Sequence, residues 1–138
     1  MIHNFNSIMN GKTNRSKGHN AERQYAKAFR ELGFDKCVTA RYGSRLHDDC
    51  GIDLINVPFN VQVKAGYRQG LNYSKELYKI DKMVSENIPQ AYPEHQYPNI
   101  LIHKKDVGKG HEKNKYDELV VMSFDDFVSL VKQIKYDL

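Results

Sequence analysis

The stretch Gly51-Ile52-Asp53-Leu54-Ile55, with Phe59-Asn60-Val61-Gln62-Val63-Lys64-Ala65 shortly after it, decides the fold. In the second stretch, apolar residues alternate with polar ones. Successive side chains of a strand point to opposite faces, so the apolar set is expected in a core, with Gln62 and Lys64 together on the other face. In the first stretch, Ile52 and Leu54 are expected on one face and Asp53 on the other.

The link between the two stretches, Asn56-Val57-Pro58, is short and contains a proline. Such a link favours an antiparallel hairpin. Pairing the strands in this way brings Asp53 close to Gln62. The sequence therefore predicts an aspartate, a glutamine and a lysine at one edge of a sheet.

Other elements are indicated on both sides of this hairpin. Upstream, the pattern predicts a helix over 19–33 that ends at Gly33, a strand over 36–41 and a loop over 42–50. Downstream, it predicts a helix over 73–87, a loop over 88–98, strands over 99–104 and 118–122, and a last helix capped by Ser123. The first helix is expected to bury Ala21, Tyr25, Ala28, Phe29 and Leu32. The last helix is expected to bury Phe124, Phe127, Val128, Val131 and Ile134.

The order α-β-β-β-α-β-β-α predicts an α/β fold with a central mixed sheet of about five strands flanked by helices. A chain of 138 residues is typical of one domain with a core of its own. Residues 1–17 are polar, basic and without periodicity, which favours a flexible N-terminal arm. Residues 18–138 are then the single folded domain.

The composition is that of a soluble globular protein, with 40% hydrophobic and 28% charged residues. No apolar run approaches the ~18 residues of a membrane span, and the first residues lack the apolar block of a signal peptide. The two cysteines, Cys37 and Cys50, do not make a disulfide framework. A reduced, cytoplasmic protein without membrane contact is expected.

The basic bias, with a net charge of +4 and a pI of about 9.0, favours a polyanionic partner such as DNA. The basic side chains gather in the N-terminal arm and around the hairpin. Those expected on DNA are Lys12, Arg15, Lys17, Arg41, Arg45 and Arg68. The alternative is a basic surface that is merely solvated.

The hairpin carries the groups that metal-dependent phosphodiester hydrolysis needs. Asp53, the side-chain carbonyl of Gln62 and the backbone carbonyl of Val63 offer oxygen ligands to a hard cation such as Mg²⁺. Lys64 is expected beside the attacking water, where it would offset developing charge. Glu22, at the border of the apolar stripe of the first helix, would add a second carboxylate. The alternative is that Glu22 is an ordinary exposed helix residue.

Competing sites are weaker. Zinc ligands could come from Cys37, His47, Cys50 and His103, of which only His47-x-x-Cys50 has a suggestive spacing. Asp48 and Asp49 are either extra metal ligands or an exposed acidic loop. The sequence shows neither a Gly-rich phosphate loop nor a Ser-His-Asp signature.

Several segments together resemble the PD-(D/E)XK nuclease superfamily. They are Gly18-His19-Asn20-Ala21-Glu22-Arg23, Leu32-Gly33-Phe34, residues 41–44, Gly51-Ile52-Asp53 and Gln62-Val63-Lys64. The pattern is most similar to archaeal-type Holliday-junction resolvases and next to Mrr-type restriction endonucleases. The resemblance implies a restriction-endonuclease-like core and an active site of Glu22, Asp53, Gln62 and Lys64 with Mg²⁺, for which Mn²⁺ would substitute. It also implies Arg23 and Ser44 at the DNA.

The chain departs from the superfamily pattern at two positions. Gln62 stands where a glutamate is more common, which removes a negative charge from the metal site. Ile52 stands where a proline often precedes the first aspartate.

The expected function is a Mg²⁺-dependent DNA endonuclease that acts on branched DNA, such as a four-way junction, in recombination or repair. A homodimer is expected because a two-fold axis presents two identical sites to a two-fold substrate. Its surface is expected on the second helix and the loop after it, with Tyr73, Tyr78 and Tyr92. The alternatives are a restriction or repair nuclease on duplex DNA, and a non-catalytic DNA-binding protein that retains the fold.

Overall fold

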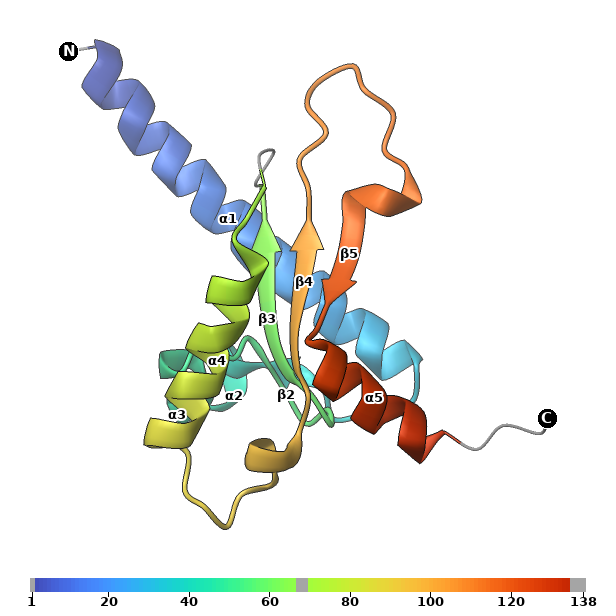
Figure 1. Ribbon diagram of the computed structural model, residues 1–138. Helices are drawn as coiled ribbons and strands as arrows, with labels where there is room; N and C mark the ends of the chain where they lie inside the picture. Colours follow the sequence, from blue (N-terminus) through green and yellow to red (C-terminus); the bar gives the residue numbers. More distant parts are fainter. Residues whose placement is uncertain (1, 67–69, 135–138) are drawn as a thin grey trace.

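The computed structural model describes the backbone of residues 2–66 and 70–134, and the side chains of residues 15–66 and 70–134. This part of the chain forms an α/β fold in which a five-stranded mixed sheet lies between helices (Figure 1). The predicted fold class and the predicted number of strands are confirmed. Among the described residues, no helix combines the length and the apolar character that a membrane span requires.

The strands follow one another across the sheet in chain order. They are β1 (Val38–Thr39), β2 (Leu54–Ile55), β3 (Asn60–Ala65), β4 (Asn99–Lys104) and β5 (Glu118–Val121). The pair β3 and β4 is parallel, whereas the other neighbours are antiparallel. A parallel pair needs a long crossover, and α4 (Tyr73–Asn87) provides it. The predicted hairpin is confirmed, with Leu54 opposite Val61.

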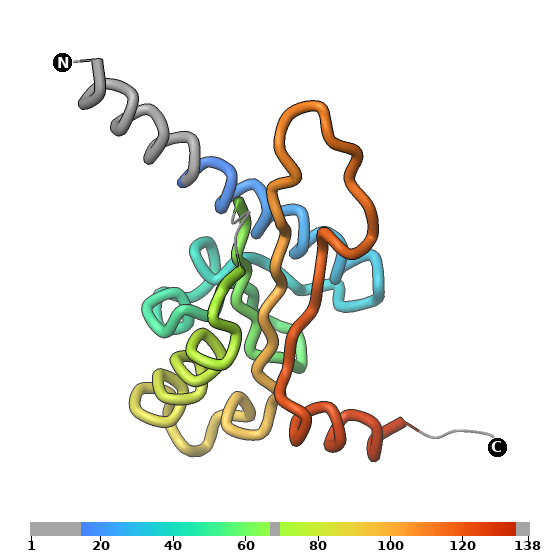
Figure 2. Tube along the Cα trace, turned by 45° about the horizontal axis from the view of Figure 1, so that its top comes forward, coloured from blue at the N-terminus to red at the C-terminus, as the bar shows by residue number. Residues whose placement is uncertain are grey.

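Two helices cover the two faces of the sheet. α1 (Ile2–Glu31) packs on one face, where a core forms that includes Ala21, Ala26, Leu54 and Val61. α4 packs on the other face, in a second core of Cys50, Ile52, Ile80, Val84 and Ile88. Figure 1 draws α1 behind the sheet and α4 in front of it, and the turned view of Figure 2 keeps them on opposite sides.

The first strand of the hairpin is shorter than predicted. Ile52 packs with α4 while Leu54 packs with α1, so the expectation that they share a face is wrong. Gly51 has a φ of 77°, and regular pairing in β2 begins only at Leu54. The two-residue alternation therefore does not extend back to Ile52.

The strand predicted over 36–41 is confined to Val38–Thr39. After it, two short helices, α2 (Ala40–Gly43) and α3 (Arg45–Asp49), replace the loop predicted over 42–50. Each begins at a capping residue. The Thr39 hydroxyl accepts a hydrogen bond from the Tyr42 N–H, and the Ser44 hydroxyl accepts one from the His47 N–H, both at 3.3 Å. Each cap satisfies a backbone N–H in the first turn of its helix, which has no partner within the helix.

α1 is longer than predicted, because it begins at Ile2 and not near His19. In the segment expected as an arm over 1–17, the described backbone, 2–17, is helical. The segment contains no proline, and extending an existing helix is easier than nucleating one. The buried face also differs, since Leu32 is 74% exposed and Ala26 is buried instead.

The predicted end of α1 at Gly33 is confirmed. Gly33 has a φ of 109°, its N–H bonds the Arg30 carbonyl, and the Phe34 N–H bonds the Phe29 carbonyl, both at 3.1 Å. These two bonds, with the Phe29 and Phe34 rings 6.1 Å apart, form a Schellman motif. The left-handed φ at its centre explains why a glycine stands there.

The C-terminal part adds η1 (Pro93–Gln96), η2 (Lys115–Asp117) and α5 (Phe124–Gln133). Ser123 caps α5 as predicted, accepting a hydrogen bond from the Asp126 N–H at 3.0 Å. The predicted burial of α5 is wrong, because none of the residues 124–133 is buried and Phe124 is 77% exposed. α5 lies at the end of the sheet and not over a face, so its apolar side has little to pack against (Figure 1).

Gly33, just after α1, and Gly18, inside it, allow a matched test of the Schellman motif. We expect Gly33→Ala to lower the free energy of unfolding by about 1 kcal/mol, because alanine is strained at a positive φ. Gly18→Ala is the control, since it lies inside the helix and an added Cβ meets nothing within 4 Å. It should raise stability by up to about 1 kcal/mol. Urea unfolding of both variants measures this, and equal effects would contradict the assigned end of α1.

Candidate active site

Asp53 is fixed against β3 by hydrogen bonds from both its backbone and its side chain. Its N–H donates to the Val61 carbonyl at 2.7 Å, and its Oδ2 accepts from the Val63 N–H at 2.7 Å. Its carbonyl accepts from the Ala40 N–H at 2.8 Å, at the start of α2. The side chain therefore has one orientation, toward the strand that carries Gln62 and Lys64.

Gln62 directly precedes Val63 on β3, the residue whose N–H binds the Asp53 side chain. Its side-chain oxygen, Oε1, is buried and has no hydrogen-bond partner among the described residues. Its amide nitrogen lies against Gly51, where an added Cβ would come within 3.3 Å of Nε2. A buried carbonyl oxygen without a partner is unfavourable by about 1–3 kcal/mol unless a ligand or water satisfies it.

The Val63 carbonyl faces the same side as Asp53. A strand residue directs its N–H and its C=O to the same neighbour, and the Val63 N–H is bonded to the Asp53 side chain. The oxygens of the hairpin that were predicted to bind the metal ion therefore belong to neighbouring residues, Asp53, Gln62 and Val63.

Glu22 approaches this group from α1. It is 8% exposed, so the alternative of an ordinary exposed helix glutamate does not hold. Its Oε1 lies 3.6 Å from the Arg41 guanidinium, whose side chain is half-exposed. Arg41 supplies the positive charge that a buried carboxylate needs.

The pKa of Asp53 is raised to about 7. Burial is the main cause, and the hydrogen bond from the Val63 N–H acts against it. The negative charges of Glu22 and Asp48 raise the pKa further, while the charge of Lys64 lowers it. Glu22 and Lys64 thus act electrostatically on Asp53, and Asp48 lies near enough to act on it as well.

Glu76 is a residue that the sequence analysis missed. Its Oε2 lies 3.7 Å from the Lys64 ammonium and its Oε1 lies 3.6 Å from that of Lys79, and its side chain is only 15% exposed. Glu76 lies three residues after Tyr73 and just before Leu77, at the border of the apolar stripe of α4. Its place at the border of an apolar helix stripe is the same sequence signal that indicated Glu22.

A hydrogen-bonded chain of three side chains runs beside the site and was also not foreseen. Nδ1 of His47 lies 2.6 Å from the Ser44 hydroxyl, and Nε2 lies 3.0 Å from Oε1 of Glu94. With Nε2 carrying the proton, the Ser44 hydroxyl donates to Nδ1. The chain fixes the orientation of Ser44, the loop residue that the family resemblance places near DNA. Ser44 and His47 share one turn of α3, but nothing in the sequence links them to Glu94.

The donor set fits a hard divalent cation. Within the described ranges, no group of three or more histidine, cysteine, aspartate or glutamate side chains is arranged to hold a metal ion. The candidate ligands are instead mixed oxygens: two carboxylates, from Glu22 and Asp53, with the Gln62 amide and the Val63 carbonyl. The unsatisfied Gln62 oxygen and a carboxyl whose charged form is disfavoured both fit Mg²⁺ or Mn²⁺.

The zinc alternative is not supported by the geometry. His47 is bonded to Ser44 and Glu94, whereas the Cys50 thiol is directed to the Met83 carbonyl at 3.9 Å. Cys37 and Cys50 are both free and buried.

The predicted DNA contacts are spread over α1, α2 and α3. Of the basic residues expected on DNA, the structure describes five side chains, and all five are at least partly exposed. They are Arg15, Lys17, Arg23, Arg41 and Arg45. Several have partners within the chain: Lys17 pairs with Asp106 at 3.7 Å, and Arg45 with Asp49 at 3.7 Å. The Lys12 side chain and Arg68 lie outside the described residues.

Comparisons with protein-family models, with curated proteins and with solved structures give no match to this chain.

The raised pKa of Asp53 predicts a pH-dependent effect of Asp53→Asn on the metal-free protein. Between about pH 4 and pH 7 the native state holds a proton that the unfolded chain has released, so wild-type stability falls as pH rises. Asparagine carries no such charge. In EDTA, we expect the variant to become more stable than wild type by up to about 4 kcal/mol as pH rises to 8.

Denaturant unfolding across this pH range provides the measurement, with Asp49→Asn as the control because Asp49 is an exposed residue of α3. The control should follow the wild-type curve. Parallel curves for wild type and Asp53→Asn would show that the Asp53 charge is not disfavoured in the fold.

Proposed function

We propose that this protein is a divalent-cation-dependent DNA endonuclease that hydrolyses phosphodiester bonds. The observation that carries the proposal is the grouping around β3: Asp53 is bonded to Val63, next to the unsatisfied Gln62 oxygen and within electrostatic range of Glu22 and Lys64. Two acids, an amide and an ammonium from three separate elements converge here.

The element order supports a restriction-endonuclease-like core, the finer fold that the family resemblance implies. α1 precedes three antiparallel strands, and α4 then crosses over to β4, which pairs in parallel with β3. The proposed site lies on the middle strands of this unit and on the helix that precedes them.

Each residue has a distinct part in the proposed reaction. The carboxylates of Glu22 and Asp53, with the oxygens of Gln62 and Val63, would hold the cation. When bound, Mg²⁺ supplies Lewis-acid polarisation of the phosphoryl oxygen and lowers the pKa of water. Lys64 offsets the negative charge that develops as the water attacks. Arg41 balances Glu22 on its exposed side, so that less of the buried charge is uncompensated.

Glu76 acts on the reaction through Lys64. The ion pair at 3.7 Å holds the ammonium of Lys64 near β3. Gln62 is neutral where a glutamate is more common, so the site carries one negative charge fewer. That leaves Glu22 as the second carboxylate of the site and makes its contribution larger.

The proposed substrate is branched DNA, such as a four-way junction, cut by a homodimer. The family resemblance supports it, as does the two-fold symmetry that a dimer shares with such a junction. Of the tyrosines expected at the dimer surface, Tyr78 and Tyr92 are exposed, but the Tyr73 hydroxyl bonds Nδ1 of His103 at 2.8 Å inside the fold. The alternatives remain a restriction or repair nuclease on duplex DNA, and a non-catalytic DNA-binding protein.

The decisive experiment measures cleavage of four-way, linear duplex and single-stranded DNA by the purified protein with Mg²⁺. We expect cleavage of the junction in preference to the linear forms. Asp53→Asn and Lys64→Ala should each lower the rate by at least about 100-fold while DNA binding persists, because both groups act mainly in the transition state. Equal cleavage of junction and duplex would favour the restriction or repair alternative. DNA binding without cleavage would favour the non-catalytic one.

A pair of glutamate variants separates a ligand from a positioning residue. Glu22→Gln should slow cleavage and raise the Mg²⁺ concentration that gives half-maximal rate, because the substitution removes a charged ligand. Glu76→Gln should lower the rate without changing that concentration, because it acts on Lys64. Glu86→Gln, an exposed residue of α4, is the control and should change neither. An unchanged Mg²⁺ dependence in Glu22→Gln would remove Glu22 from the metal site.

A further inference from the structure

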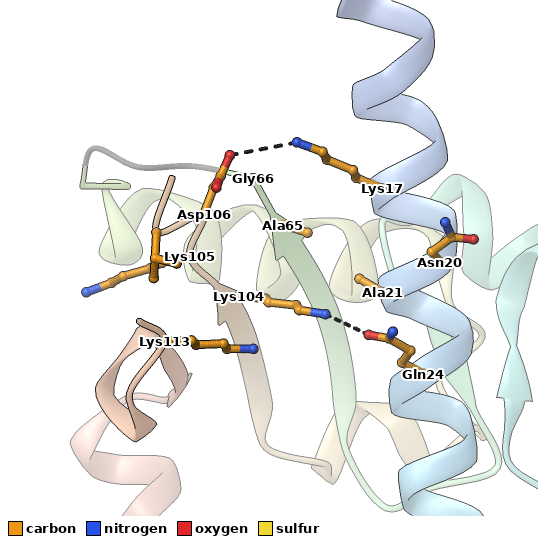
Figure 3. A pocket seen from close by; sticks show the side chains of 11 residues that line it. Lys17, Asn20, Ala21, Gln24, Ala65, Gly66, Lys104, Lys105, Asp106 and Lys113 are labelled. Atoms are coloured by element: carbon orange, nitrogen blue, oxygen red, sulfur yellow. Dashed lines mark hydrogen bonds and ion pairs between the residues drawn. The ribbon is translucent and has the colours of Figure 1, made fainter. Parts of the chain in front are cut away.

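A cavity of about 300 Å³ lies between α1, the carboxyl ends of β3 and β4, and the segment after β4 (Figure 3). Its walls come from three parts of the chain that are far apart in sequence. The lining residues are Lys17, Asn20, Ala21, Gln24, Ala65, Gly66, Lys104, Lys105, Asp106, Val107 and Lys113. We call it the lysine pocket.

The lining of the lysine pocket is strongly cationic, with four lysines and one aspartate. Lys104 is held by a hydrogen bond of 2.7 Å to Gln24, and Lys17 pairs with Asp106 at 3.7 Å. Figure 3 shows Lys104 and Lys113 extending toward α1, whereas Lys105 extends away from it. An ammonium has three donors, so Lys104 keeps two for a ligand after bonding Gln24.

The positive charge of the lysine pocket favours the binding of an anion. Asp106, and Glu118 at 4.0 Å from Lys113, neutralise only part of it. Because the small residues Ala21 and Ala65 form part of the wall, the ammonium groups can approach one ligand together. Several ammonium donors around an open space match the oxygens of a phosphate group.

The lysine pocket adjoins the proposed active site. Ala21 directly precedes Glu22 on α1, and Ala65 directly follows Lys64 on β3. Successive strand residues face opposite sides of a sheet, so Ala65 and the pocket lie on the α1 face, from which Glu22 also projects, while Lys64 points to the α4 face. A DNA strand with one phosphate at Glu22 and Asp53 would therefore bring a neighbouring phosphate to the pocket on this face.

We propose that the lysine pocket binds a backbone phosphate of the DNA strand that is cut, next to the scissile phosphate. This inference rests on the proposed nuclease function and adds a subsite to it. Lys104 and Lys113 supply most of the attraction, and Gln24 positions Lys104. The pocket holds the strand in register with the catalytic groups without contacting bases.

The test compares two pairs of substitutions that remove equal charge. Lys104→Gln with Lys113→Gln alters the pocket, and glutamine at 104 retains a donor toward Gln24. Lys82→Gln with Lys132→Gln is the control, since both lysines are exposed and neither lines the pocket. Affinity for fluorescent DNA is measured in EDTA at several salt concentrations, and Mg²⁺-dependent cleavage is measured on the same DNA. Thermal unfolding checks that each variant folds.

We expect the pocket pair to lower the slope of log affinity against log salt by about 0.7–0.9, because one DNA phosphate is no longer neutralised, and the control pair to leave the slope unchanged. If wild type cleaves DNA and both pairs give equal slopes, the pocket inference is overturned while the proposed function stands. If wild type neither binds nor cleaves DNA, both fail.

Lysine acetylation of the wild-type protein gives an independent measurement that does not depend on a variant folding. Bound DNA should protect Lys104 and Lys113 more than Lys82 and Lys132, as read by mass spectrometry. Inorganic phosphate and thymidine monophosphate are the competing probes. Protection by either of these but not by DNA would overturn the inference in favour of a small phosphorylated ligand.

Discussion

The hydrogen bond from the Val63 N–H to the Asp53 carboxylate is the constraint on which the site depends. It turns a backbone donor that would otherwise serve a β ladder toward a side chain, so the edge of β3 opens where pairing with β2 stops. At that opening the Val63 carbonyl faces the same side, and the Gln62 side-chain oxygen has no hydrogen-bond partner among the described residues. Because β2 is short, the Asp53 side chain can occupy this position beside β3 in place of a paired strand residue.

Two apolar cores pack on opposite faces of the sheet around this opening. α1 presents Glu22 from one face of the sheet, and α4 presents Glu76 to Lys64 from the other. Packing of each helix is secured by apolar burial, which fixes the helices far better than the polar contacts would. The acids are therefore held in place by residues such as Ala26 and Ile80 that take no part in the reaction.

The sequence predicted the elements whose apolar periodicity is clear. It did not predict features that depend on helix caps or on contacts between residues far apart in the chain. The hairpin, α4 and β4 followed from periodicity, and the placement of Asp53 beside Gln62 followed from the hairpin. The helices α2 and α3 did not, because the hydroxyls of Thr39 and Ser44 determine them and not an apolar pattern. Glu94 could not be linked to His47, since 47 residues separate them and only the tertiary fold brings them together. The burial predicted for α5 failed for a related reason: an amphipathic pattern shows which side of a helix is apolar but not whether anything lies opposite it.

α1 carries Lys17 at the lysine pocket and Glu22 at the proposed metal site on one continuous helix. A helix rises about 1.5 Å and turns about 100° per residue, so these two side chains have a fixed separation and a fixed angular relation. Substitutions between them leave that relation intact. Adding or removing a single residue there would rotate one group by more than a quarter turn relative to the other. This stretch of the chain is therefore intolerant of changes in length, so homologues that keep both groups should show no insertion or deletion between them.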